Sequence, residues 1–265
     1  MPVLFAKIAR VLRHLEYCDE FRHCFSVFRR PARMIAGYLG LPVSYPFTCG
    51  TTGGTKIRVS NRMDLVTAWI IYLRREYTVD PDDEVIVDCG ANIGVFTLYA
   101  ASTAPRSRIF AIEPFPSTFQ ELRENVGLNH LNSRVSCLSV ALSGSDGRVN
   151  MYAAAHVSSQ GREVIQPSLP DTVSVPAMSL FSLLGGLGVE AVDLLKMDIE
   201  GSEHAVLLNS RPGVLACVKR ISIEYHRTAP KQPLFDFLNR AGFVLQRDRV
   251  LGRDYGVAEF VSEAP

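Results

Sequence analysis

The sequence predicts an α/β fold with a seven-stranded, mostly parallel sheet, and two observations support this prediction. First, from residue 84 onward short apolar runs alternate with amphipathic runs, and five such alternations follow one another. Strands that alternate with helices form a parallel sheet covered by helices on both faces. Second, the last two apolar runs are joined only by "RVLGRD", which is too short for a crossover. These two runs should therefore form a hairpin that gives the sheet an antiparallel edge strand.

The elements follow in a regular order along the chain. The predicted strands are 84–90, 108–115, 135–142, 193–201, 220–226, 243–248 and 255–261. Predicted helices lie near residues 93–102, 117–128, 179–186 and 202–210. Ser117 and Gln120 have the spacing of a capping box, which would make Ser117 the N-cap of the second helix. Residues 143–178 contain turn residues and two short strand-like pieces, so we expect an inserted hairpin or flap rather than a second domain.

Residues 1–60 precede this pattern and predict a basic helical cap followed by a loop. Residues 1–40 carry seven basic and three acidic side chains, and apolar residues between positions 4 and 15 follow helical spacing. The simplest interpretation is a cap with a solvated basic face. A peripheral contact with a membrane surface or an anionic substrate is the alternative. We expect the main domain to span residues 61–265.

The overall composition limits the classes of partner. Lys and Arg total 28 against 27 acidic residues, so no large electric field favours a nucleic-acid partner. The six cysteines form no CxxC pair, and we interpret them as reduced thiols of a cytoplasmic protein. Charges interrupt the first apolar segment, so it predicts neither a membrane span nor a signal peptide.

A glycine-containing turn follows the first predicted strand. The run "VIVDCGANIGVFTLYA" closes the strand with Asp88 and turns through Gly90, Ala91, Asn92 and Gly94. Such a turn lets the backbone approach a ligand closely at a helix N-terminus. The nicotinamide fingerprint would need glycine at position 92 and a small residue at 95, where this sequence has asparagine and valine. The acidic residue instead suits a cationic ligand such as S-adenosylmethionine, since its carboxylate could accept a hydrogen bond from the ligand's ammonium.

The end of the next strand supports the same ligand. Glu113 and Pro114 follow about 20 residues after the glycine turn, where a carboxylate accepts both ribose hydroxyls of a bound nucleoside. Asp88 and Glu113 are therefore both candidate cofactor-binding residues.

Charged residues also end the fourth and fifth predicted strands. Lys196, Asp198 and Glu200 occur at every second position, so on a strand they share one face. In the same way "ISIEYH" places Glu224 and His226 on one face of the neighbouring strand. Ligands of open α/β sheets bind at the carboxyl ends of the strands. We therefore expect these side chains to converge on a ligand crevice.

These runs resemble S-adenosylmethionine-dependent methyltransferases of the FkbM type. The resemblance covers roughly residues 61–228 and is carried by "NRMDLVTAWIIYLRREY", "VDCGANIGVFTLYAA", "AIEPFPSTFQELRENVGLN", "VALSGSDGRV", "DLLKMDIEGSEHAVL" and "ISIEYH". It implies a class I methyltransferase (Rossmann-like) fold. It also implies methyl transfer to a hydroxyl of a small molecule, sugar, glycolipid or polyketide-like product, without identifying the acceptor.

An alcohol is a poor nucleophile until its proton is removed, so the reaction needs a base. His226 is the best candidate, because its unperturbed pKa of about 6.5 suits neutral pH. Asp198 and Glu200 are rival bases, and Lys196 could pair with the carboxylates or orient the acceptor. A divalent cation held by Asp198, Glu200 and Glu224 is a less favoured alternative. A purely structural Lys–carboxylate network is a third.

Two further cofactor contacts stay open. The family often has an acidic residue after "ALS", where this chain has Gly144, so Ser143, Asp146 or only backbone could contact the adenine. Glu76 lies before the first strand and could either cover the methionine end of the cofactor or pair with one of two adjacent arginines. Methylation of RNA or protein, a nicotinamide-dependent oxidoreductase and a non-catalytic binding module are the competing functions.

Overall fold

The computed structural model describes residues 18–152, 164–165, 172–253 and 255–263. Its internal contacts divide the chain into a first unit, residues 1–76, and a second unit, residues 77–265. This boundary lies later than the expected one at residue 60, because the helix that begins at Arg62 packs with the elements before it. The predicted amphipathic pattern between residues 4 and 15 lies outside the described residues.

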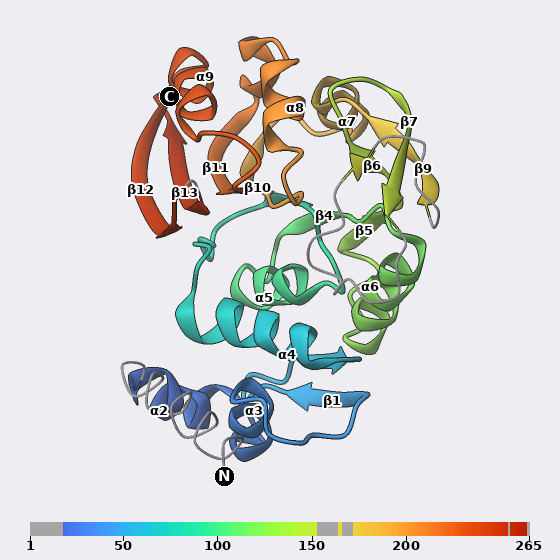
Figure 1. Cartoon of the computed structure of the whole chain (residues 1–265), viewed down its shortest axis with the longest axis vertical. Coiled ribbons are helices and arrows are strands. Elements are labelled where there is room, and N and C mark those ends of the chain that lie inside the picture. Colours follow the sequence, from blue (N-terminus) through green and yellow to red (C-terminus); the bar gives the residue numbers. More distant parts are fainter. Residues whose placement is uncertain (1–17, 153–163, 166–171, 254, 264–265) are drawn as a thin grey trace. The chain divides into compact units, whose positions relative to one another are not determined.

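The first unit consists of short helices and one hairpin (Figure 1). Its elements are α2 (Cys18–Val27), α3 (Pro31–Tyr38), β1 (Phe47–Gly50), β2 (Lys56–Val59), α4 (Arg62–Trp69) and the π-helical η2 (Ile70–Arg74). Asn61 caps α4, and Asp64 completes a capping box by accepting from the Ser60 and Asn61 amides. Asp64, which belongs to the family-like run, thus fixes the start of a helix. The helical run ends at Arg75, which has a positive φ of 50°.

The second unit contains the predicted seven-stranded sheet. Its strands are β3 (Val85–Cys89), β4 (Arg108–Ile112), β5 (Val135–Leu138), β10 (Val192–Met197), β11 (Val218–Tyr225), β12 (Phe243–Gly252) and β13 (Tyr255–Ser262). Their order is β12-β13-β11-β10-β3-β4-β5, and β3, β4, β5, β10 and β11 run parallel. The order reverses between β3 and β10, so a crevice is expected at the carboxyl ends of these two strands.

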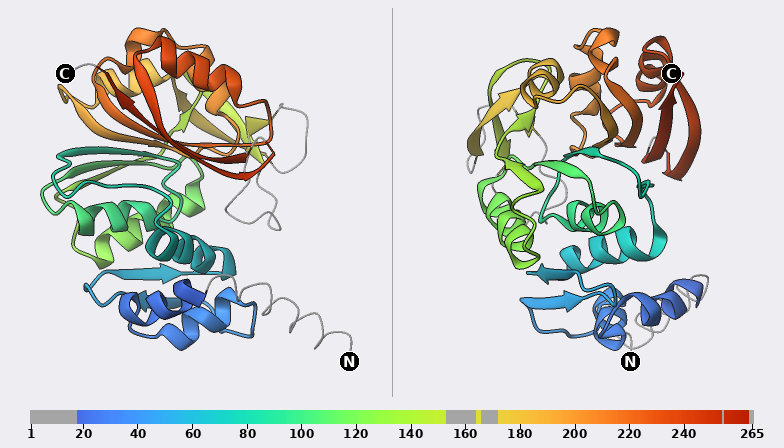
Figure 2. Two further views of the ribbon diagram at one scale, coloured as in Figure 1. Left: turned by 90° about the vertical axis from the view of Figure 1, so that its left-hand side faces the viewer. Right: turned by 180° about the vertical axis from the view of Figure 1, so that it is seen from behind.

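Helices cover both faces of this sheet. They are α5 (Val95–Thr103), α6 (Pro116–Leu128), α7 (Leu180–Gly186), α8 (Glu203–Leu208), the short 3-10 helix η3 (Pro212–Leu215) and α9 (Gln232–Arg240). In Figure 2, α5 and α6 lie on one side of the sheet and α8 and α9 on the other. The central strands are therefore apolar on both faces, and Val87, Leu195 and Ile223 are fully buried.

The last two strands form the expected hairpin, with one correction. The antiparallel strand is β13, which pairs with both β11 and β12, so it lies one position in from the edge. The edge strand β12 itself runs parallel to β11. The reason is the connection: α9 carries the chain past the position beside β11, and the short turn then returns it into that gap.

The inserted segment forms a small sheet of its own. Its strands β6 (Ala141–Leu142), β7 (Gly147–Tyr152), β8 (Val164–Ile165) and β9 (Thr172–Met178) have the order β6-β9-β7-β8. The predicted strand 135–142 is therefore wrong as one element. It breaks after Leu138, because Ala141 and Leu142 pair with β9 instead of extending the edge of the main sheet.

The predicted capping box of α6 is also wrong. The helix begins with Pro116 at its first position, after Phe115 as N-cap, and no side chain caps it. Proline suits this position, since its fixed φ is helical and its missing amide would be unpaired there. Gln120 donates instead to Glu124, one turn further on. Among the described residues, no helix has the length and apolar character needed to cross a membrane.

Candidate active site

The site lies where β3, β4, β10 and β11 end. In the parallel register Lys196 is opposite Asp88 on one side and Ser222 on the other. Asp198, immediately after β10, donates its amide to Cys89 O at 3.0 Å, so the chain leaves the sheet directly above the glycine turn. The sequence spacing thus brings the two predicted groups of residues to one edge.

The glycine turn is sterically locked in place. The amides of Gly90 and Ala91 both donate to Ile112 O, and Gly90 and Gly94 have φ values of 79° and 90°. A Cβ at Gly90 would lie 1.7 Å from Asp198 O. Asn92 also adopts a positive φ, 52°. Only glycine fits position 90, because both its φ and its contact with Asp198 exclude a side chain.

Glu113 ties the turn to the next helix. Its Oε2 accepts from the Asn92 amide at 3.0 Å and its Oε1 from the Phe115 amide at 2.9 Å. The side chain is largely buried beside the turn, and Pro114 lies between it and the start of α6. Glu113 therefore sets the shape of the loop at which we expect the cofactor.

Asp88 and Lys196 form a buried ion pair. Asp88 Oδ1 lies 3.0 Å from Lys196 Nζ, Asp88 Oδ2 accepts from Thr97 at 2.6 Å, and the two side chains are 0% and 3% exposed. Burial opposes the charge on Lys196, but Asp88 and Asp198 raise its pKa, so the ammonium stays protonated. The expected direct contact between Asp88 and a donor ammonium is a correction: the carboxylate has no exposed surface and is held by Lys196 and Thr97. Lys196 also donates to Gly90 O at 3.0 Å, so the pair supports the turn from below.

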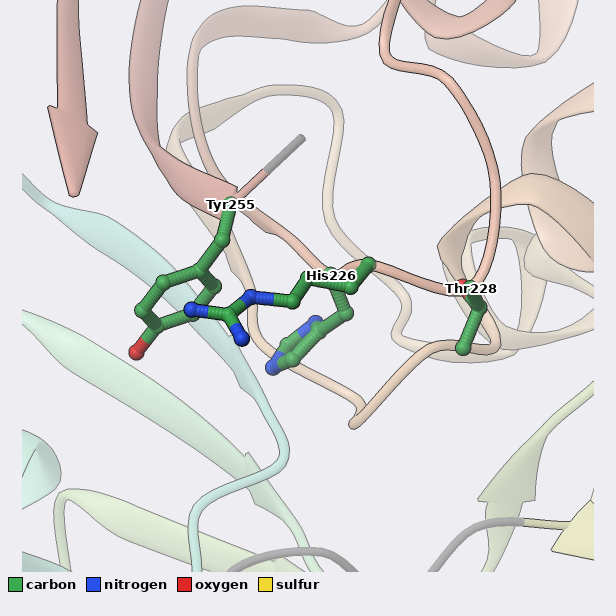
Figure 3. Close-up of a pocket in the computed structure, with 4 residues that line it drawn as sticks. His226, Thr228 and Tyr255 are labelled. Carbon is green, nitrogen blue, oxygen red and sulfur yellow. The ribbon is translucent and has the colours of Figure 1, made fainter. Parts of the chain in front are cut away.

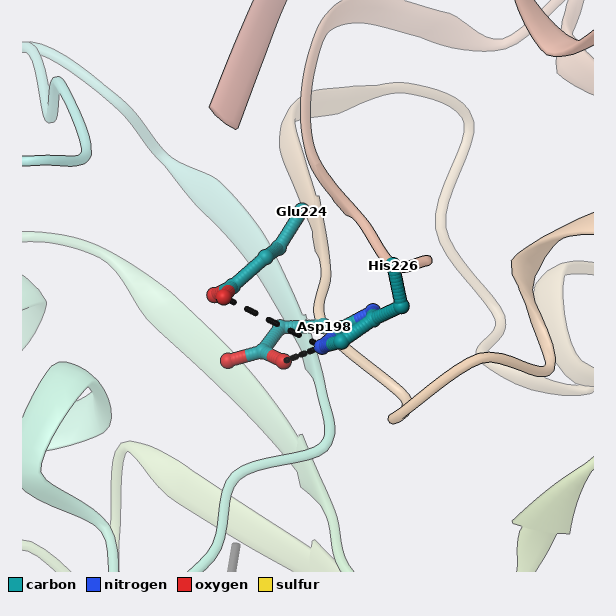
Figure 4. A group of neighbouring side chains, drawn as sticks. All are labelled: Asp198, Glu224 and His226. Carbon is teal, nitrogen blue, oxygen red and sulfur yellow. Dashed lines mark ion pairs between the residues drawn. The ribbon is translucent and has the colours of Figure 1, made fainter. Parts of the chain in front are cut away.

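Three side chains converge above this pair: Asp198, Glu224 and His226 (Figure 4). His226 Nε2 lies 3.9 Å from Asp198 Oδ1 and 3.9 Å from Glu224 Oε1. Tyr77 donates to Glu224 Oε2 at 2.8 Å and lies 3.3 Å from Asp198 Oδ2. Lys196 Nζ is 3.5 Å from the same Asp198 oxygen.

His226 is held from its other ring nitrogen. Nδ1 donates to Glu203 Oε1 at 3.0 Å, and Glu203 has no exposed surface. Glu200 Oε2 lies 3.5 Å from Nε2. Glu200 was expected on the strand face of Lys196 and Asp198, but β10 ends at Met197 and Glu200 has a φ of 53°. A turn therefore brings Glu200 to His226.

Protonation differs from the sequence-based expectation. Burial, reinforced by the charge of Asp198, raises the pKa of Glu224 to about 8. Burial alone would lower the pKa of His226, but Glu203, Asp198 and Glu224 raise it to about 9. His226 is thus protonated at neutral pH in the free protein. Its unperturbed pKa is no argument for a base here, and the carboxylates of Asp198 and Glu200 are better placed to accept a proton.

A pocket of about 400 Å³ opens beside the cluster (Figure 3). It is lined by His226, Arg227, Thr228 and Tyr255. The Tyr255 ring lies 5.9 Å from the His226 ring, and the Arg227 guanidinium carbon lies 5.8 Å from the centre of the same tyrosine ring. This volume is within the range of small-molecule sites.

Other predicted contacts lie apart from the cluster or have structural partners. Ser143 follows β6 and donates its amide to Met178 O. Asp146 accepts from the Ser179 amide and the Ser182 hydroxyl, so it fastens the start of α7. Glu76 is the last residue of the first unit.

Sequence reasoning did not assign Tyr77, Glu203 and Tyr255 to the site. Glu203 closes the family-like run "DIEGSE", and Tyr77 ends the run before the first strand, so both had a sequence signal. Tyr255 had none, because it reaches His226 only through the inward position of β13.

The order of the sheet, the glycine turn at its switch point and the polar cluster at the strand ends define a class I methyltransferase fold and site. Residues 88–247 match the Methyltransferase FkbM domain, which covers more than half of the chain. The chain therefore belongs to the FkbM methyltransferase family, and it is a methyltransferase.

Several relatives are similar over part of the chain. The AMB antimetabolite synthetase AmbE of Pseudomonas aeruginosa is 32% identical over 64% of this chain, which spans 10% of AmbE. The methyltransferase sdnD of Sordaria araneosa is 30% identical over 64% of this chain and 77% of sdnD. The 31-O-demethyl-FK506 methyltransferase FkbM of Streptomyces tacrolimicus is 28% identical over 58% and 70% of the two chains. The crystal structure of methyltransferase FkbM from Methylobacillus flagellatus is 16% identical, with a TM-score of 0.47 over 88% of this chain and 59% of that chain.

Proposed function

We propose that this chain transfers a methyl group from S-adenosylmethionine to a hydroxyl of a small-molecule, sugar or lipid-linked acceptor. The observation that carries the proposal is the cluster of Asp198, Glu224 and His226 directly above the Gly90 turn. An acceptor hydroxyl must lose its proton as it attacks, and this cluster offers carboxylates to take it.

The turn from Gly90 to Gly94 is the proposed seat of the donor. Glu113 stands where α/β folds bind ribose hydroxyls. Both of its oxygens already accept backbone amides, and a carboxylate oxygen can accept a second hydrogen bond. Asp88 acts indirectly, since it holds Lys196 under the Gly90 carbonyl.

The reaction would follow an in-line displacement. The acceptor oxygen bonds to the methyl carbon, the carbon–sulfur bond breaks, and sulfur keeps the electron pair. The hydroxyl proton goes to a carboxylate of the site, Asp198 or Glu200. The pocket of His226, Arg227, Thr228 and Tyr255 would hold the rest of the acceptor, and positioning supplies much of the rate.

The names of relatives support a hydroxyl acceptor. Besides FkbM, the hexuronic acid methyltransferase AglP of Haloferax volcanii is 26% identical over 60% of this chain. The 2-O-methyltransferase NoeI of Sinorhizobium fredii is 25% identical over 50% of it. The thiols of Cys24, Cys49 and Cys89 are free and buried, which suits a reducing, cytoplasmic location.

The test combines binding and turnover. Calorimetry should detect binding of S-adenosylmethionine, and the donor with a labelled methyl group should label an acceptor in a panel of sugars, uronic acids and glycolipids. Asp198→Asn should abolish labelling while donor affinity falls less than about tenfold, because Asp198 contacts the acceptor side. Asp193→Asn is the matched control, since Asp193 lies at the opposite end of β10 and should leave labelling unchanged.

Two results would contradict the proposal. Full labelling by the Asp198→Asn variant would remove Asp198 from the mechanism. Heat on titration with NAD, but none with S-adenosylmethionine, would instead favour an oxidoreductase.

A further inference from the structure

We propose that Asp198, Glu224 and His226 bind one divalent cation, which in turn holds the acceptor hydroxyl. The cation site stands on the geometry of these side chains alone. Its part in catalysis rests on the proposed function above.

The inner atoms of the three side chains face a common point (Figure 4). Asp198, Glu224 and His226 each offer one ligand atom, and these atoms lie within 4.8 Å of one another. His226 Nε2 is 3.9 Å from Asp198 Oδ1 and from Glu224 Oε1. Two ligands of one ion with bonds of about 2.0–2.3 Å can be at most about 4.6 Å apart. A cation could therefore join these atoms with side-chain shifts of a few tenths of an ångström.

The outer atoms of the same side chains are each held by a residue outside the trio. Glu203 accepts from His226 Nδ1 at 3.0 Å, Tyr77 donates to Glu224 Oε2 at 2.8 Å, and Lys196 lies 3.5 Å from Asp198 Oδ2. A buried carboxylate on the far nitrogen of a histidine is the usual outer-shell partner of a metal-bound imidazole, because it fixes the ring and directs the other nitrogen. This contact points to a ligand role that clustered acidic groups alone would not indicate.

The donor set restricts the kind of cation. Two carboxylates and a neutral imidazole supply two negative charges, which match a divalent ion. Carboxylate oxygens suit Mg²⁺ and Mn²⁺, and one imidazole also suits Mn²⁺, Fe²⁺ or Zn²⁺. The side chains are 14–25% exposed, so the open side of the cation could bind the acceptor from the neighbouring pocket.

The cation would lower the pKa of the acceptor hydroxyl by binding its oxygen. The hydroxyl proton passes to Glu200, whose Oε2 lies 3.5 Å from His226 Nε2 and whose side chain is 29% exposed, and from there to water. The oxygen then bonds to the methyl carbon, and the electron pair of the broken bond stays on sulfur. Protons and charge balance without another reactant.

The test measures Mn²⁺ binding to the full chain by electron paramagnetic resonance and calorimetry, with S-adenosylmethionine binding measured in parallel. We expect one Mn²⁺ per chain. His226→Ala and Glu224→Gln should each weaken its affinity more than about 100-fold, since each removes a ligand atom. Glu203→Gln should weaken it about 10–100-fold, as is typical of an outer-shell partner. Asp193→Asn, which removes a carboxylate at the far end of β10, should bind Mn²⁺ as the wild type does.

The outcomes separate this proposal from the proposed function. No bound Mn²⁺ in wild-type protein that still binds S-adenosylmethionine would overturn the cation site and leave the methyl transfer standing. Equal Mn²⁺ affinity in wild type and His226→Ala would also overturn it. Mn²⁺ binding that depends on His226, in a protein that binds no S-adenosylmethionine, would support the cation site and contradict the proposed function. Thermal melts of each variant check that the fold is kept.

Discussion

The buried pair of Asp88 and Lys196 allows a quantitative test of the site's architecture. We consider Lys196→Met, which keeps an unbranched apolar stem but removes the ammonium. The side chains are 0% and 3% exposed and their charged atoms lie 3.0 Å apart, so the variant leaves the Asp88 carboxylate buried without its countercharge. Removing one partner of such a pair costs about 3–5 kcal/mol. That is a large share of the roughly 5–15 kcal/mol by which a domain is typically stable.

The double variant provides the control. In Asp88→Asn/Lys196→Met neither charge of the pair is left in the interior, and the amide oxygen introduced at position 88 can still accept from Thr97. A buried pair replaced by neutral groups of similar volume is often close to neutral in stability. Urea denaturation should therefore give a double variant that is more stable than Lys196→Met by about 2 kcal/mol or more.

Two results would refute this account of the pair. If Lys196→Met lowered the free energy of unfolding by less than about 1 kcal/mol, Asp88 would have to be hydrated or neutral, contrary to its burial. If the effects of the two single changes simply added, the two side chains would not be coupled. Either result would also remove the reason why Asp88 is unavailable to a cationic donor.

Two further predictions concern the turn and the pH dependence of stability. Gly90→Ala should abolish S-adenosylmethionine binding in calorimetry, since its Cβ would meet Asp198 O at 1.7 Å, whereas Gly127→Ala, with nothing within 4 Å, should bind normally. Burial alone would raise the pKa of Asp193, but hydrogen bonds from Lys219, Val85 and Glu84 lower it below its usual value. The contribution of Asp193 to stability is therefore complete above the unfolded-state pKa of about 4 and is lost as the pH falls through the lowered pKa, so Asp193→Asn should flatten the acid side of a pH–stability curve measured by urea denaturation. An unchanged slope would contradict the Asp193 contacts.

Most of the main sheet could be predicted because its signals are local. Runs such as "EVIVDCG" and "RISIEYH" are long enough and apolar enough to specify buried strands, and a short connection specifies a hairpin. The errors arose where a partner far along the chain decided the outcome. Ala141 and Leu142 left the predicted strand to pair with β9, and β13 took an inner position that no local pattern encodes.

The sequence by itself determined that Lys196, Asp198, Glu224 and His226 meet at one edge, because the carboxyl ends of adjacent parallel strands lie together. Only the tertiary structure decided what each group does there. Burial turned Asp88 from an expected ligand into the partner of Lys196, and Glu203 turned His226 from a base into a protonated or ion-binding group. Spacing along a strand fixes the face on which a side chain lies. Exposure and charge depend on neighbours such as Tyr77 and Glu203, which come together only when the chain is folded.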